Sequence, residues 1–82
     1  MYYERITEAI RLVASSELDE VQKKEVQSIL EEAKESVQEN SKEKASSSKN
    51  RFSTFLIFAG NTAQKLISAL AGLTTIARFF GI

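Results

Sequence analysis

The chain has 82 residues and contains no Cys, His, Pro or Trp. Without Cys it cannot form disulfides or thiolate metal sites, and without His it lacks the side chain best suited to acid–base chemistry near neutral pH. Residues 1–40 carry five basic and ten acidic side chains (−5), and residues 41–82 carry six basic and one acidic (+5). Because the two halves attract each other, this distribution favours an antiparallel helical hairpin or head-to-tail association of copies.

Two helices are predicted in the acidic half of the chain. The first covers residues 2–15, and its apolar face consists of Tyr2, Ile6, Ala9, Ile10 and Val13. The second covers residues 17–40 and begins with a capping box, in which Ser16 is the N-cap and Asp19 the acid at the third helical position. Its apolar stripe consists of Leu18, Val26, Ile29, Leu30, Ala33 and Val37.

Residues 41–50 are predicted to be a linker. This stretch has one Ala and no larger apolar side chain, so it offers nothing to bury. Glutamates gather near the end of the preceding helix, where they oppose its dipole. The linker lysines are therefore expected to lie close to these glutamates; they are Lys42, Lys44 and Lys49.

Residues 51–80 are predicted to form one long apolar helix. Nine apolar residues recur at alternating spacings of four and three, and we call them the heptad stripe: Phe52, Leu56, Ala59, Ala63, Leu66, Leu70, Leu73, Ala77 and Phe80. Such a stripe must be buried along its length. Further apolar residues beside it, including Ile57 and Phe58, exceed what the first two helices can cover. The excess predicts self-association, with interface anchors at Phe52, Leu56, Leu66, Leu70, Leu73, Ile76 and Phe80.

A membrane is the alternative partner for this helix. Lys65 near its centre costs about 2.5–3.5 kcal/mol on insertion scales, which argues against a simple span. An interfacial or pore-lining position fits better, because no Asp or Glu follows Glu43 and cationic, Phe-rich helices suit anionic lipid. A cytoplasmic location is expected, with membrane association as the alternative.

Other chemistry has little support in the sequence. No set of nucleophile, base and orienting residue can be assembled, so we expect no enzyme, no catalytic residues and no cofactor. The glutamates at 31, 32, 35 and 39 lie on one helix face and lack the convergent ligands that a metal needs. The basic residues between Lys42 and Arg51 form a short cluster without a nucleic-acid-binding signature, so a nucleic acid partner is not expected.

The layout also resembles a known class of module. An acidic helix opened by Leu18-Asp19 is followed by a polar linker and an aliphatic helix that ends in Phe79-Phe80-Gly81. This order is similar to the helical-hairpin tails at the C-terminal end of bacterial abortive-infection and defence-type proteins. The resemblance implies an accessory oligomerising or docking tail, with chemistry elsewhere and a larger parent protein as a further partner.

These observations predict a single all-α domain over residues 1–82. Its expected form is a long antiparallel hairpin with a short N-terminal helix, similar to a three-helix bundle and assembled into a homo-oligomer. The predicted function is a non-catalytic self-association or docking module. Two alternatives stay open: a membrane-interacting or membrane-permeabilising amphipathic effector, and a small helical inhibitor or adaptor that binds another protein.

Overall fold

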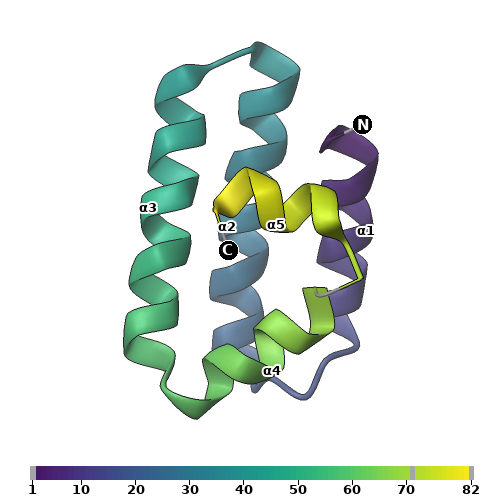
Figure 1. Cartoon of the computed structure of the whole chain (residues 1–82), viewed down its shortest axis with the longest axis vertical. Coiled ribbons are helices and arrows are strands. Elements are labelled where there is room, and N and C mark those ends of the chain that lie inside the picture. The colour runs from purple at the N-terminus through teal and green to yellow at the C-terminus, as the bar shows by residue number, and fades with distance from the viewer. Residues whose placement is uncertain (1, 71, 82) are drawn as a thin grey trace.

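The computed structural model describes residues 2–70 and 72–81, and within these ranges every regular element is a helix. The all-α prediction is confirmed. The five described helices are α1 (Tyr2–Ala14), α2 (Glu20–Glu39), α3 (Lys42–Ala59), α4 (Asn61–Leu70) and α5 (Thr74–Phe80). Figure 1 shows α2 and α3 side by side and antiparallel, with α1 on the other side of α2. The short helices α4 and α5 lead from the end of α3 back to α1.

Helix α2 begins three residues later than predicted, because its N-cap is Asp19 and not Ser16. The Asp19 carboxylate accepts a hydrogen bond from the Gln22 amide at 2.8 Å, and the Gln22 side chain accepts one from the Asp19 amide at 3.4 Å. This pair is a complete capping box. The Ser16 hydroxyl instead donates to the Val13 carbonyl at 2.7 Å, so it finishes the turn that follows α1.

The predicted linker at residues 41–50 is wrong, since residues 42–50 form the first half of α3. Helix α2 ends at Glu39, and its C-cap residue Asn40 adopts a left-handed conformation with φ 53°. Ser41 then caps α3 directly by accepting a hydrogen bond from the Lys44 amide at 3.2 Å. The segment needs no large apolar side chain, because it packs through small residues; Ser48 is fully buried and donates to the Ala45 carbonyl at 2.9 Å.

The predicted single helix over residues 51–80 is also wrong. The chain bends at Gly60, where φ is 59° and ψ is −125°, and helical structure stops again between Leu70 and Thr74. These breaks replace the long hairpin with a shorter α2–α3 pair and two helices that fold back towards α1. Because of this return, α4 and α5 cover the chain's own core.

The core is built from residues of all five described helices. Most predicted apolar positions of the first two helices are buried, including Ile6, Val13 and Ile29, but Tyr2 is 41% exposed. Phe52 of α3 and Phe80 of α5 stack at its centre, with ring centroids 4.2 Å apart and an interplanar angle of 18°. Six of the nine residues of the heptad stripe are therefore buried and the other three are half-buried, and they are covered by helices of the same chain.

Candidate interaction surface

The seven predicted interface anchors do not form an exposed surface. Six of them are buried in the core cluster, and the seventh, Leu56, is half-buried and packed against it. The buried six are Phe52, Leu66, Leu70, Leu73, Ile76 and Phe80. In this fold these side chains hold the chain's own helices together, so a partner of the folded monomer must contact other residues.

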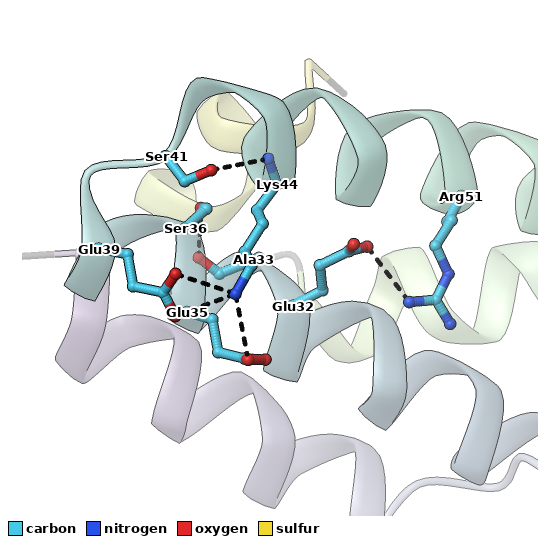
Figure 2. Close-up of polar contacts among 8 residues, drawn as sticks. All are labelled: Glu32, Ala33, Glu35, Ser36, Glu39, Ser41, Lys44 and Arg51. Carbon is cyan, nitrogen blue, oxygen red and sulfur yellow. Dashed lines mark hydrogen bonds and ion pairs between the residues drawn. The ribbon is translucent and has the colours of Figure 1, made fainter.

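One side of the α2–α3 pair is held by ion pairs, which Figure 2 shows. Lys44 lies 2.9 Å from a carboxylate oxygen of Glu39 and 3.7 Å from one of Glu35. Arg51 lies 3.2 Å from Glu32 and also donates to the Ser28 hydroxyl at 2.9 Å. The prediction that linker lysines lie close to the glutamates at the end of α2 is confirmed for Lys44.

These ion pairs involve many of the charged residues that the sequence analysis considered as possible metal or nucleic-acid sites. Three of the acidic residues considered for a metal are neutralised by Lys44 or Arg51. Among the residues that the structure describes, no group of three or more carboxylates is arranged to hold a metal ion. Lys49 lies over the Phe79 ring, 5.2 Å from its centroid, so three of the four residues in the short basic cluster are engaged within the chain.

The pKa of Lys44 is raised above its ordinary value of 10.5, chiefly because the ammonium donates a hydrogen bond to Glu39. A raised pKa in the folded state means that the pairing stabilises the fold fully below pH 10.5 and is lost as the pH rises through the folded pKa. We expect Lys44→Gln to lower the melting temperature at pH 7, and we expect this difference from wild type to vanish in strongly alkaline buffer.

Thermal denaturation monitored by circular dichroism at several pH values measures this effect. Lys42→Gln is the matched control, because it removes the same charge from an exposed position two residues away. Equal losses in the two variants at pH 7 would contradict the role assigned to Lys44.

Large apolar side chains remain exposed at the end of the α2–α3 pair that lies next to Gly60. Val21 of α2 is 78% exposed, and Ile57 and Phe58 of α3 are 76% and 83% exposed. We call these three residues the apolar end. A Phe on a monomer's surface with most of its area in water is a marker of an interaction site when apolar neighbours accompany it.

A hollow of about 400 Å³ lies between α2 and α3 beside Phe58. Phe55, Phe58 and Ala59 supply its apolar lining, and the remaining lining residues are polar: Gln22, Glu25, Asn50, Arg51 and Thr54. The two charged residues among them are paired, with 3.5 Å between a guanidinium nitrogen of Arg51 and a carboxylate oxygen of Glu25. The hollow is suited to receiving an apolar side chain.

Sequence reasoning found part of this surface. Ile57 and Phe58 were among the apolar residues in excess of the heptad stripe, which was the signal that pointed to them. Val21 was missed, because it follows Asp19 and Glu20 in a stretch that reads as the polar start of a helix.

Comparisons of the chain with protein-family models, curated proteins and solved structures found no match. The resemblance to tails of defence-type proteins therefore stays a prediction. None of the helices in residues 2–70 and 72–81 has the length and apolar character needed to cross a bilayer.

Proposed function

We propose that the chain is a non-catalytic module that associates with a second copy of itself through the apolar end. The observation that supports this most directly is the exposure of Phe58, which at 83% is the largest among the exposed apolar side chains. Burying a Phe side chain contributes about 1.5–3 kcal/mol, and a symmetric contact buries it twice. The apolar end therefore offers a driving force for association that the isolated chain leaves unused.

Charge favours a second copy as the occupant. A contact related by a twofold axis places the same surface on both sides. An unpaired charge in that surface would therefore lie near the same charge of the other copy and be repelled by it. Among the described residues that line the hollow, two are charged, Glu25 and Arg51, and they neutralise each other. The other polar lining residues are uncharged. The whole chain also has a net charge of zero, so long-range repulsion does not oppose association of copies.

Phe58 has a suitable receiving site in this arrangement. It lies next to the hollow on its own chain, and a twofold contact carries it to the equivalent hollow of the partner. Phe55 and Ala59 of the partner's hollow would offer apolar contacts to the incoming ring, and Asn50 and Thr54 would offer polar ones. Protein interfaces usually combine contacts of both kinds.

We expect Phe58→Ser to weaken self-association, at a cost of about 2 kcal/mol or more for loss of a central aromatic contact. The measurement is the dimer dissociation constant by sedimentation equilibrium. Phe58→Leu should keep most of the association, because it keeps an apolar side chain. Ile67→Ser is a second control, since it removes an exposed apolar side chain from α4, away from the apolar end. Equal dissociation constants for wild type and Phe58→Ser would contradict the proposal.

The same variants distinguish the alternative functions. Co-sedimentation with anionic phospholipid vesicles that depends on Phe58, together with a monomeric chain in the absence of lipid, would replace self-association by membrane binding. A monomeric chain that binds neither lipid nor its own copies would leave the docking function to a different protein, as an adaptor or as the tail of a parent protein.

A further inference from the structure

We infer that the copies associate by exchanging their C-terminal arms, which consist of α4 and α5, about a hinge at Gly60. The partner of the arm is then the surface that α1 and α3 of a second copy present. This inference rests on the proposed self-association and specifies its mechanism. Three observations support it: the conformation of Gly60, the spacing of the heptad stripe across the hinge, and the position of the apolar end.

Gly60 is the only residue between α3 and α4, so the whole change of direction occurs there. Its φ of 59° and ψ of −125° lie in a region that glycine reaches easily and that other residues avoid. A Cβ placed on Gly60 would meet no atom within 4 Å. A glycine is therefore required at position 60 because of the backbone conformation of the bend. A larger side chain would not clash with its surroundings. Single-residue hinges of this kind favour arm exchange.

The heptad stripe continues across the hinge without a change of spacing. Ala59 precedes the bend and Ala63 follows it, four residues apart, and Leu66 comes three residues later. A bent connection does not require this regularity, whereas a continuous helix with one apolar face does. If Gly60 adopted helical angles, α3 and α4 would join into one helix, and no Pro opposes this.

A straightened chain cannot remain alone, because its arm would leave the core. Leu66, Leu70, Ile76 and Phe80 are all buried in the bent form, and Phe80 stacks on Phe52. A second straightened copy presents an identical vacated surface on α1 and α3. Exchange of arms restores the same buried contacts between chains, so it costs little beyond the entropy of association.

The apolar end lies where the exchanged form gains new contacts. Ile57 and Phe58 immediately precede the hinge, and they are exposed in the bent form. In the exchanged form the two straightened helices pass each other near their hinges, which places these residues at the crossing. Their exposure in the monomer and burial in the dimer supply the free energy that favours exchange over the bent monomer.

Gly60→Ala tests the hinge. Alanine disfavours the bend and favours a continuous helix, so we expect the dimerisation constant to rise by about tenfold or more. Gly81→Ala is the matched control: Gly81 also has a positive φ of 74° and free space around its Cα, but it follows α5 and connects no two described helices. A Gly60→Ala chain with the wild-type constant, or an equal rise in Gly81→Ala, would overturn the exchange.

A crosslinking experiment tests the exchange on the wild-type backbone. The chain has no Cys, so Tyr2→Cys and Phe79→Cys can be placed in separate copies and refolded together. The two rings are 5.5 Å apart in the bent monomer, so a short thiol crosslinker joins the two chains when the arm of one copy docks on α1 of the other. We expect the crosslinked pair in the dimer fraction. A dimer that gives no such product would overturn the exchange and leave surface association intact, whereas a wild-type chain that never dimerises would overturn both.

Discussion

A Leu70→Glu chain is expected to be unfolded at pH 7. Leu70 is 1% exposed and belongs to the core cluster, so a glutamate there has neither water nor a basic partner from the apolar residues around it. Protonating a carboxyl of ordinary pKa at pH 7 costs about 1.36 kcal/mol per pH unit, or roughly 4 kcal/mol in total. Loss of the leucine packing adds about 2–5 kcal/mol. The sum reaches the whole stability of many small domains.

Far-ultraviolet circular dichroism measures the loss of helix in this variant. Ser68→Glu is the matched control, because it adds the same charge to an exposed position of the same helix and should leave the fold intact. A Leu70→Glu chain with wild-type helicity and melting temperature would show that α4 does not cover the core.

Phe52→Ala is expected to lower the free energy of unfolding by about 3–5 kcal/mol. Phe52 is fully buried and is one of the largest buried side chains, and its ring stacks on Phe80 at 4.2 Å. The substitution leaves a cavity where α3 meets α5, because the surrounding helices can relax only partly. Part of the loss is the aromatic pair itself, which contributes about 0.5–1.5 kcal/mol beyond area burial.

Urea denaturation measures this loss as a lower midpoint. Phe58→Ala on the same helix is the control, because it makes the same substitution at a side chain that is 83% exposed. At a protein concentration low enough to keep the chain monomeric, Phe58→Ala should change the midpoint little. Similar losses at the two positions would contradict the placement of Phe52 in the core.

Periodicity predicted which side chains are buried better than it predicted where the helices end. The spacing of Ile6, Ala9 and Val13 identified the inner face of α1, and the heptad stripe identified residues that form the core. Whether a residue is buried depends on which face of its helix it occupies. The apolar face of α3 continues into α4 because the spacing of apolar residues does not change across the bend at Gly60. Helix ends depend on single local interactions, such as the Asp19 capping box at the start of α2, where Ser16 was the predicted N-cap.

The linker was mispredicted because its helix is stabilised by few apolar contacts. Residues 42–50 contain no large apolar side chain, yet Ser41 caps the helix and Lys44 pairs with glutamates of α2. These interactions become visible only when α2 and α3 lie side by side. The opposite charges of the two halves of the chain predicted that the halves attract each other. They could not predict that the turn between α2 and α3 consists of only Asn40 and Ser41.

The predicted interface anchors lie in the monomer's own core for a related reason. The stripe residues were expected to contact another chain, since a straight helix over residues 51–80 would leave them without cover. A bend at Gly60 lets α4 and α5 cover the same residues from within the chain. A glycine inside a periodic pattern is compatible with both a helix and a turn. What remains exposed after the bend is the apolar end, and Ile57 and Phe58 fall outside the stripe.

Sedimentation equilibrium of the wild-type chain beside Phe58→Ser is the most direct test of self-association. With a chain mass of 9.2 kDa, we expect the wild-type mass to rise with concentration towards twice this value. We expect Phe58→Ser to remain at 9.2 kDa over the same concentrations. A wild-type chain that stays at 9.2 kDa from micromolar to millimolar concentration would contradict the proposed function.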